Sequence, residues 1–411
     1  MVSTGQGSPI LCCALNFCLP RMTSLSDQPH LRPPWWRDER ILKLLLQVAF
    51  VVAVLLVCGI LAQNLLASLR RLGISLGFRF LGNSANFGIT EGLIPYDPSE
   101  SYLKALAVGA VNTLWLSAVS IVLATAMGFV LGMARLSSNW LARQLATVVT
   151  EIFRNVPVLL IVIFWYQGVI LTLPGVRNSL SIGGLVFINQ RGVKLPGLDP
   201  SGWLVPALAI VIAAGWGIRK LLLARRPELG SLQRNLWVAA GVALLAVACW
   251  VLFPEPPVRL DVPVLERFNF RGGIQLSAEF TAMMLGLVTY TGCYIAEVVR
   301  GSFLAVPRGQ WEAARAVGLS ELQTFRLVIV PQALRIMIPS LNTQYLTLIK
   351  NSSLAIAVGF SDLFNISSTI INQSGRSVEM FAILMATYLT FNLVVSYGMN
   401  WLNARVKLVE R

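Results

Sequence analysis

The stretch that decides the fold covers residues 296–331 and reads AEVVRGSFLAVPRGQWEAARAVGLSELQTFRLVIVP. It carries too many charges to be buried in lipid. Within it, Glu312–Val317 is a run of good helix formers. Gly318 follows directly, and glycine commonly ends a helix. The first half of the stretch therefore predicts one short helix that stops at a glycine turn.

The second half of the stretch predicts another short helix. Ser320 with Gln323 forms the S-x-x-Q pattern of a capping box, which begins a helix. Pro331 is expected to limit this helix, because proline lacks a backbone donor and clashes with the preceding turn. The small side chains of Ala313 and Ala314 would let the surface of a partner approach closely. We therefore predict a helix pair around a glycine turn, shaped to be held by another protein.

Long apolar runs lie on both sides of this stretch. The chain has 411 residues, of which 55% are apolar and 13% are charged, whereas roughly 25% are charged in an average soluble domain. This composition excludes a disordered chain, a disulfide scaffold and an ordinary soluble enzyme. The runs are Leu44–Ala67, Ala105–Ala134, Asn155–Val176, Ser201–Ile218, Asn235–Pro254, Phe280–Ala296, Ile336–Ser361 and Met380–Ala404.

Each run approaches the roughly 20 residues that a helix needs to cross the hydrocarbon of a bilayer. Seven of them carry no charge, and Ile336–Ser361 fits only if Lys350 is tolerated inside the membrane. Strands of a membrane barrel would be shorter and would alternate in polarity. We predict an all-α polytopic membrane protein with about eight transmembrane helices.

The distribution of basic residues predicts the orientation. With both termini in the cytoplasm, 21 Lys and Arg residues lie in cytoplasmic segments, 11 lie on the opposite side and Lys350 lies in a span. Positive charge is enriched on the cytoplasmic side of membrane proteins, so this orientation is favoured. Basic loops facing anionic lipid explain the net charge of +14. No nucleic-acid partner is expected, because no basic patch has interleaved aromatic residues.

The sequence divides into four predicted parts. These are a polar, disordered N-terminal tail (1–40), a first transmembrane helix with an external segment (41–103), a transmembrane domain (104–404) that contains a cytoplasmic loop at 300–335, and a cytoplasmic C-terminal tail (405–411). The stretch before Met22 is a poor signal peptide. We therefore expect that translation starts at Met22.

The sequence lacks recognisable motifs for nucleotide binding, nucleophilic catalysis and metal binding. The chain has no G-x-x-x-x-G-K-[ST] loop for ATP and no G-x-S-x-G nucleophile motif. One histidine, His30, and six cysteines without zinc-like spacing predict no metal site. We expect a protein that is not an enzyme and binds no cofactor, so the energy for any transport must come from a partner.

The charged stretch resembles the EAA loop of ABC-type importer permeases. That pattern has Glu-Ala-Ala, a glycine four residues later, and a hydrophobic-x-hydrophobic-Pro ending. The matching residues are Glu312, Ala313, Ala314, Gly318, Val328, Val330 and Pro331, with valine at both hydrophobic positions where Ile and Leu are usual. The resemblance implies a type I importer permease fold. It also implies that this loop docks into a cleft of a separate subunit, which hydrolyses ATP.

The resemblance extends over residues 102–401 and is to permeases of polar amino-acid importers, with the general L-amino acid permease group as the nearest. The matching positions are Asn112–Leu114, Gly128 with Gly132, Glu151 with Arg154–Pro157, Tyr294–Gly301 and Lys350–Leu354. It implies an inner-membrane subunit that translocates polar L-amino acids. The implied partners are the ATPase subunit, a related second permease, a periplasmic amino-acid-binding protein and lipid.

Two candidate sites each have a simpler structural interpretation. The 312–331 loop could be a solvated linker, although a linker need not match every position of the pattern. Lys350, with Asn351 and Ser352 after it, is a candidate for the translocation path, where the ammonium could meet a substrate carboxylate. The alternative for Lys350 is a structural ion pair or a side chain that extends to the membrane surface near a helix break.

Three residue pairs have a structural interpretation as the favoured one. Glu297 with Arg300, and Glu151 with Arg154, have the i,i+3 spacing of a local ion pair on a helix. The Gly128–Gly132 spacing permits close contact between two helices.

An ion-coupled secondary carrier that works alone is the alternative from a different class of function. Such a carrier needs acidic or polar residues inside its spans as ion sites. The predicted spans carry few charges, and the helix pair would then have no purpose. The importer subunit is therefore the favoured prediction.

Overall fold

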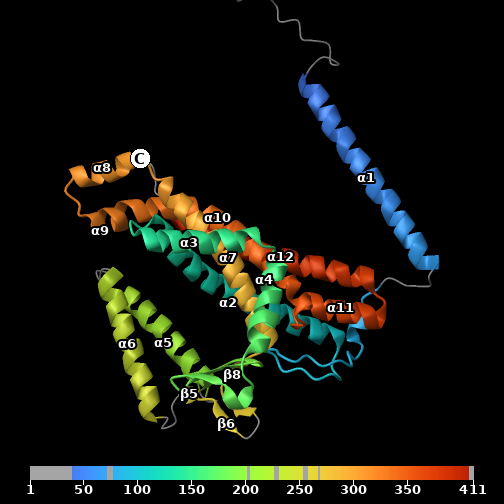
Figure 1. Ribbon diagram of the computed structural model, residues 1–411, viewed down its shortest axis with the longest axis horizontal. Coiled ribbons are helices and arrows are strands. Elements are labelled where there is room, and N and C mark those ends of the chain that lie inside the picture. Colours follow the sequence, from blue (N-terminus) through green and yellow to red (C-terminus); the bar gives the residue numbers. More distant parts are fainter. Residues whose placement is uncertain are drawn as a thin grey trace, which may run out of the picture. The chain divides into compact units, whose positions relative to one another are not determined.

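The computed structural model describes residues 39–71, 77–200, 204–225, 231–252, 258–266 and 269–406. The chain forms two units, Met1–Leu76 and Gly77–Arg411 (Figure 1). The predicted start at Met22 and almost all of the predicted tail 1–40 lie outside the described residues, and helix α1 already begins at Glu39. The last helix extends to Val406 and so includes the first two residues of the predicted C-terminal tail. Residues 407–411 lie outside the described residues.

The first unit contains one long apolar helix, α1 (Glu39–Arg71). Its segment Leu42–Asn64 is long and apolar enough to cross a membrane, and none of it is buried within the unit. A helix that is apolar on all sides either lies inside a large protein or spans a membrane. The first predicted span thus corresponds to a candidate span with nearly the expected bounds.

The second unit contains four further candidate spans among its described residues. They are α2 (Tyr102–Leu136), α7 (Ala278–Leu304), the continuous helical segment Glu321–Ala357, and α12 (Ser377–Val406). Two more helices, α5 (Leu204–Arg225) and α6 (Ser231–Leu252), cover the fourth and fifth apolar runs and pack against each other.

The third predicted span, Asn155–Val176, corresponds to the second half of a bent pair of helices. Helix α3 (Trp140–Asn155) is followed by α4 (Val158–Ile163), a π-helical turn (Phe164–Val169) and a short 3-10 turn, and the two halves are bent by 109°. Pro157 explains the break, because the residue before a proline is excluded from the helical conformation. The described residues thus hold five candidate spans, or six with this pair. The total of eight remains a prediction.

Helix α3 was not predicted. No predicted span covers residues 135–154, because charged residues separate the apolar runs there. In the structure Asn139 caps the helix by accepting hydrogen bonds from the backbone N–H groups of Leu141 and Ala142. Charged residues on one face and apolar ones on the other make α3 amphipathic.

Helices α2 and α7 form the centre of the second unit (Figure 1). They approach closely because glycines face the partner helix. A Cβ atom built at Gly128 would lie 2.6 Å from Cβ of Ile295, and one at Gly132 would lie 2.7 Å from Cβ of Val299. The predicted role of this glycine pair in close helix packing is confirmed.

The predicted end of a helix at Pro331 is wrong. Helix α9 (Glu321–Gln323) continues through a π-helical turn (Thr324–Ile329) into α10 (Val330–Asn351), and a 3-10 turn (Ser352–Ala357) follows. Pro331 lies in the first turn of α10, where a missing N–H costs little. The π-helical turn Thr324–Ile329 precedes it. Such single turns occur inside α-helices where the regular hydrogen-bond pattern is interrupted.

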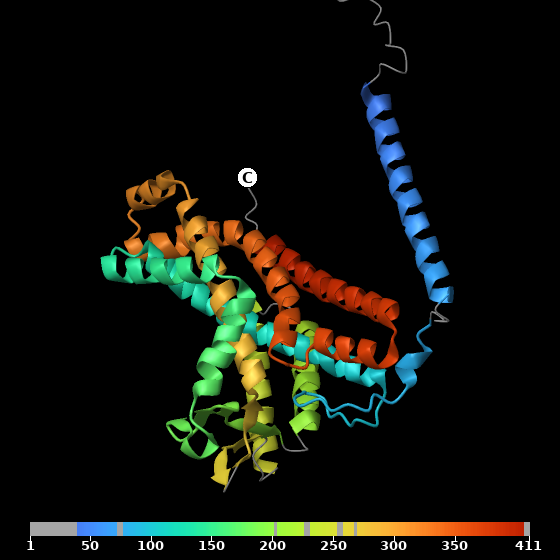
Figure 2. The ribbon, with the colours of Figure 1, turned by 45° about the vertical axis from the view of Figure 1, so that its right-hand side comes forward.

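Helices α10 and α12 pack side by side, and a short helix, α11 (Leu363–Ser374), packs on α2 and α12 (Figure 2). Asp362 caps the start of α11, and Gly375, with a φ of 68°, ends it. The segment 77–101 adds Phe80 and Ala85 to the core between these helices.

The prediction of an all-α chain is wrong in the loops, where eight short strands lie among the described residues. They are β1 (Leu180–Ile182), β2 (Val186–Asn189), β3 (Gly192–Leu195), β4 (Gly197–Pro200), β5 (Val258–Asp261), β6 (Val264–Glu266), β7 (Asn269–Arg271) and β8 (Ile274–Leu276). A four-stranded antiparallel sheet has the order β1-β2-β3-β8, and β4–β5 and β6–β7 are separate pairs. Strands of three or four residues are too short for a clear alternation of polarity.

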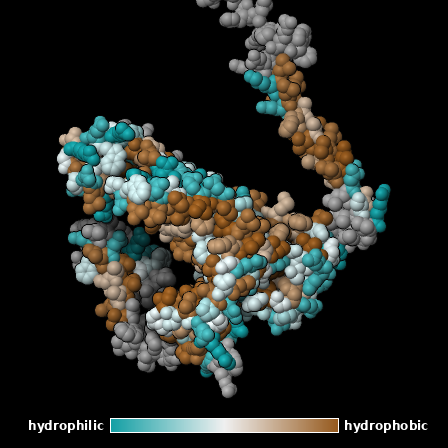
Figure 3. Space-filling view, in the orientation of Figure 1, coloured by the Kyte–Doolittle hydropathy of each residue, from teal (hydrophilic) through white to brown (hydrophobic). Residues whose placement is uncertain are grey.

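The surface of the second unit is banded by polarity. Apolar side chains cover the middle of the helices, whereas hydrophilic ones gather over the α8 region and over the strands (Figure 3). Exposed apolar side chains on α12 include Met385, Leu389, Leu393 and Tyr397. A soluble protein rarely exposes so much contiguous apolar surface, so this band is suited to lipid or to another apolar subunit.

Candidate functional site

The helix pair predicted from residues 308–323 forms a rigid corner. Helix α8 (Arg308–Ala316) ends where the N–H of Gly318 donates to the carbonyl of Arg315 (2.9 Å) and the N–H of Leu319 donates to that of Ala314 (3.2 Å). These two bonds define a Schellman motif. Gly318 has a φ of +86°, a conformation that other residues adopt only with strain. The predicted glycine stop is confirmed.

A capping box begins the second arm of the corner. The side chain of Ser320 accepts a hydrogen bond from the N–H of Gln323, and the side chain of Gln323 accepts one from the N–H of Ser320 (3.0 Å). This is the predicted arrangement. Because both ends of the turn satisfy their backbone groups internally, the corner holds its shape without a partner.

The corner presents the matched positions unequally. Glu312, Ala313 and Gly318 are exposed, whereas Ala314 is buried against the body of the protein and Pro331 is half-buried in α10. Val317 and Leu322 are 81% and 75% exposed. Two well-exposed apolar side chains beside the turn are typical of a surface that a partner covers.

Aromatic packing attaches the corner to the transmembrane helices. Phe303, near the end of α7, stacks on Phe325 in the π-helical turn, with ring centroids 5.5 Å apart. Trp311 and Phe325 also pack on the main core cluster. The stack thus joins the end of α7 to the turn before α10, and Trp311 joins α8 to the same cluster.

An ion-pair cluster lies where α2, α3 and α7 meet. Glu297 contacts Arg135 (2.6 Å), Arg300 (2.5 Å) and Arg154 (3.4 Å). Glu151 contacts Arg154 (3.9 Å) and Arg135 (3.8 Å). Both predicted local pairs, Glu297 with Arg300 and Glu151 with Arg154, are confirmed, and Arg135 joins them into one cluster.

The role of Arg135 was missed because its partners are far away in the sequence. Its side chain is only 9% exposed, so two carboxylates from other helices are needed to compensate its charge. The only sequence signal was an arginine at the end of an apolar run, and this pattern is common at membrane surfaces.

Lys350 lies in the last turn of α10 and opens onto a groove. The groove has a volume of about 310 Å³ and is lined by Lys350, Ser353, Phe364, Phe381, Leu384, Met385 and Tyr388. Lys350 is exposed, and no ion pair joins it to any carboxylate among the described residues. A structural ion pair therefore does not account for it in the described part of the chain.

The two residues after Lys350 are placed differently. Ser352 is fully buried, and its hydroxyl donates to the carbonyl of Ile349 (2.7 Å). Asn351 is half-buried at the end of α10. The next serine, Ser353, lines the groove beside Lys350, so the groove brings together Lys350 and Ser353 rather than the predicted trio.

Tyr388 is a further groove residue that the sequence did not suggest. Its hydroxyl lies 3.4 Å from Oδ2 of Asp362, a carboxylate with no exposed surface. Asp362 also accepts a hydrogen bond from the N–H of Asn365 (2.8 Å). The groove therefore has a polar side that is anchored in the protein interior.

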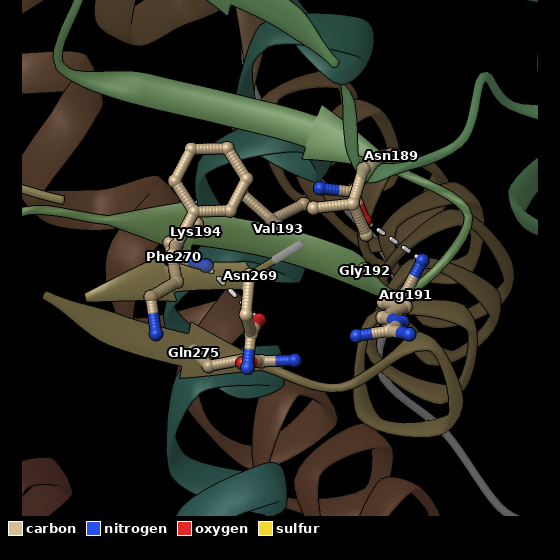
Figure 4. Close-up of a pocket in the computed structure, with 9 residues that line it drawn as sticks. Asn189, Arg191, Gly192, Val193, Lys194, Asn269, Phe270 and Gln275 are labelled. Carbon is tan, nitrogen blue, oxygen red and sulfur yellow. Dashed lines mark hydrogen bonds between the residues drawn. The ribbon is translucent and has the colours of Figure 1, made fainter. Parts of the chain in front are cut away.

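A second polar cavity lies between the four-stranded sheet and strand β7 (Figure 4). Its lining includes Asn189, Arg191, Lys194, Asn269 and Gln275, but its volume is about 10 Å³. That is room for about one water molecule. The cavity is too small to be a site for an organic solute.

The described residues hold no group of three or more His, Cys, Asp or Glu side chains that could bind a metal ion. The candidate sites in the described residues are therefore the corner and the groove.

Comparison with known proteins defines the class. The profile of the family "Binding-protein-dependent transport system inner membrane component" matches residues 242–408. The chain is 42% identical to YhdX of Escherichia coli over 374 residues, which cover 89% of this chain and 94% of YhdX.

Two further relatives are similar over most of the chain. The general L-amino acid transport system permease protein AapQ of Rhizobium johnstonii is 41% identical over 396 residues (95% of this chain, 97% of AapQ). The glutamate/glutamine/aspartate/asparagine transport system permease protein BztB of Rhodobacter capsulatus is 35% identical over 412 residues (91% and 96%).

The chain therefore belongs to the family of inner membrane components of binding-protein-dependent transport systems. It is a multi-pass membrane protein and a permease subunit, not an enzyme. The predicted resemblance to permeases of ABC-type amino-acid importers is confirmed. A secondary carrier acting alone is not favoured.

Proposed function

We propose that this chain is a transmembrane subunit of an ATP-binding-cassette importer that carries polar L-amino acids across the inner membrane. The names of AapQ and BztB, which describe amino-acid permeases, support this substrate class. The proposal includes a type I importer permease fold with eight spans and both termini in the cytoplasm.

The corner at residues 308–323 docks on the ATPase subunit. The observation that carries this assignment is a fixed turn whose apolar neighbours, Val317 and Leu322, are exposed. Glu312, Ala313 and Gly318 would contact the partner. Ala314 packs inward and would fix α8 on the body of the protein. Pro331 lies outside the corner, in the first turn of α10.

Coupling is mechanical in this account. ATP binds the partner subunit and this chain binds no cofactor. Movement of the docked corner passes through the Phe303–Phe325 stack to α7 and α10. The cluster around Glu297 holds α2 and α3 to α7 at the same end. A related second permease completes the pathway, and a periplasmic binding protein delivers the substrate.

The groove at Lys350 contributes to the translocation path. An ammonium with no carboxylate partner among the described residues offers a charge-assisted hydrogen bond to the α-carboxylate that every amino acid carries. Ser353 and Tyr388 add hydroxyl groups, and Phe364 and Phe381 add apolar contact.

Affinity purification of the tagged chain from native membranes tests this function. The expected companions are an ATPase subunit, a second permease and, in the presence of substrate, a binding protein. A Gly318→Val variant should be recovered with the second permease but without the ATPase. Recovery of the wild-type chain alone, in membranes that import amino acids through it, would contradict the proposal.

A further inference from the structure

A cavity of about 250 Å³ lies away from the corner and the Lys350 groove, between the segment before α2, the start of α7 and strand β8. Polar and aromatic side chains line it, including Glu91, Asn112, Trp115, Gln275, Phe280 and Phe360. Its volume is large enough for the charged end of a small organic molecule. Neither the corner nor the groove uses these residues.

Glu91 brings a negative charge to this cavity without a compensating partner. No Lys or Arg among the described residues forms an ion pair with it. The two oxygens of its carboxylate share long hydrogen bonds (3.3 and 3.4 Å) from the N–H of Ser277. Burial raises the pKa of Glu91, hydrogen bonds from Ser277 oppose part of this rise, and the nearby charge of Glu279 adds a smaller increase. A cation in the cavity would relieve both increases.

Asn112 adds an acceptor with a fixed orientation. Its Nδ2 donates to the carbonyl oxygens of Glu91 (2.8 Å) and Ser361 (2.9 Å). Both amide hydrogens are therefore used, and the amide cannot reverse without losing both bonds. Its Oδ1 accepts no hydrogen bond from the described residues, so it remains available to a donor.

Trp115 provides an aromatic surface in the same cavity. Its side chain is 40% exposed, and an indole face attracts organic cations. A metal ion such as Ca²⁺ would require six to eight oxygen ligands, more than this lining offers. The combination of a carboxylate with no ion-pair partner among the described residues, an amide oxygen and an indole ring fits an alkylammonium group.

We propose that this cavity binds the α-ammonium group of an amino acid, held by Glu91, Asn112 and Trp115. The inference rests on the proposed function, since it names a second substrate contact of the same transporter. Lys350 would meet the carboxylate and Glu91 the ammonium at separate stages of one path.

Cysteine labelling at Leu93 tests the site without relying on transport. Leu93 lines the cavity and is 60% exposed. In the assembled complex, a Leu93→Cys variant is treated with a cationic or an anionic methanethiosulfonate reagent of matched size. The unsubstituted chain gives the background from native cysteines. We expect the cationic reagent to react about tenfold faster than the anionic one.

A Glu91→Gln substitution in the Leu93→Cys background should remove most of this preference. Glutamine keeps one side-chain oxygen that can accept the N–H of Ser277, so this variant removes the charge and keeps a hydrogen bond to the residue that caps α7. The matched control is Glu100→Gln, which lies in the same segment but pairs with Lys104. It should leave the preference unchanged.

Protection from labelling identifies the ligand group. L-serine should slow the reaction at Leu93→Cys, and L-glycerate, which has a hydroxyl in place of the ammonium, should not. An unchanged charge preference in Glu91→Gln, equal protection by both compounds, or protection by neither would overturn the ammonium site. If selective protection occurs but the complex imports no amino acid with ATP, the proposed function fails and the ammonium site stands.

Discussion

The Oε2 atom of Glu297 lies 2.6 Å from Nη1 of Arg135, and this contact joins α7 to the end of α2. The same carboxylate group also contacts Arg154 on α3 and Arg300 on α7. One carboxylate therefore holds three helices together close to the point where α7 leads into the corner. Its removal should affect both stability and coupling.

A Glu297→Gln substitution should lower the free energy of unfolding by about 2 kcal/mol, because it leaves the buried guanidinium of Arg135 with only a distant carboxylate partner. Chemical denaturation of the purified complex measures this change. The same variant should hydrolyse ATP with less stimulation by substrate, because α2 and α3 are no longer held to α7.

The matched control for that experiment is Glu321→Gln. Glu321 pairs with Arg315 at 3.2 Å, but its side chain is 87% exposed. An exposed pair contributes about 0–1 kcal/mol, so the loss should be small. Equal losses in Glu297→Gln and Glu321→Gln would show that the cluster is not a structural centre.

Two glycines of the corner should respond in opposite ways to alanine. At Gly318 the φ of +86° makes alanine strained although the space is open, so Gly318→Ala should lose about 1 kcal/mol. Gly309, in helix α8, also has open space and should gain about 0.5–1 kcal/mol as alanine. Thermal unfolding of both variants checks the signs. A neutral Gly318→Ala would mean that the turn is not fixed by its backbone conformation.

Close packing of α2 on α7 predicts a severe effect at Gly128. A Cβ there would lie 2.7 Å from the carbonyl oxygen of Gly292 as well as 2.6 Å from Ile295, so Gly128→Ala should destabilise by about 1–3 kcal/mol. Gly301→Ala is the control on α7, since nothing lies within 4 Å of its Cβ position. The yield of monodisperse complex after purification measures both. Full tolerance of Gly128→Ala would require the two helices to be further apart.

Lys350→Met should abolish amino-acid uptake and leave assembly with the ATPase intact, because it removes the charge and keeps most of the side-chain volume. Lys350→Arg should retain part of the uptake. The control is Lys104→Met, which breaks only a surface pair with Glu100. Normal uptake by Lys350→Met would return Lys350 to a purely structural role.

Local patterns in the sequence predicted much of this structure. The apolar run at Leu44–Ala67 predicts a membrane-spanning helix from its length and composition alone. The turn at Gly318 and the capping box at Ser320 also follow from residues within a few positions of one another. The same is true of the Glu297–Arg300 pair, which shares one helix face.

Features that depend on distant residues were not predicted. Helix α3 was not predicted for a local reason, because the charged residues on one of its faces interrupt the apolar run. The sheet of β1, β2, β3 and β8 was not predicted because its strands have three or four residues and one of them comes from a separate loop. Arg135, Tyr388 and Glu91 acquire their roles only when segments far apart in the sequence meet.

We propose that this permease subunit moves solute only when a docked ATPase drives its corner. The most direct measurement is uptake of a labelled L-amino acid into proteoliposomes that contain the complete complex and its binding protein, with wild-type or Gly318→Val chain. We expect the wild-type complex to take up the amino acid only when ATP is present. The Gly318→Val complex should show no uptake. Uptake that persists without ATP, or that follows an imposed ion gradient, would contradict this proposal.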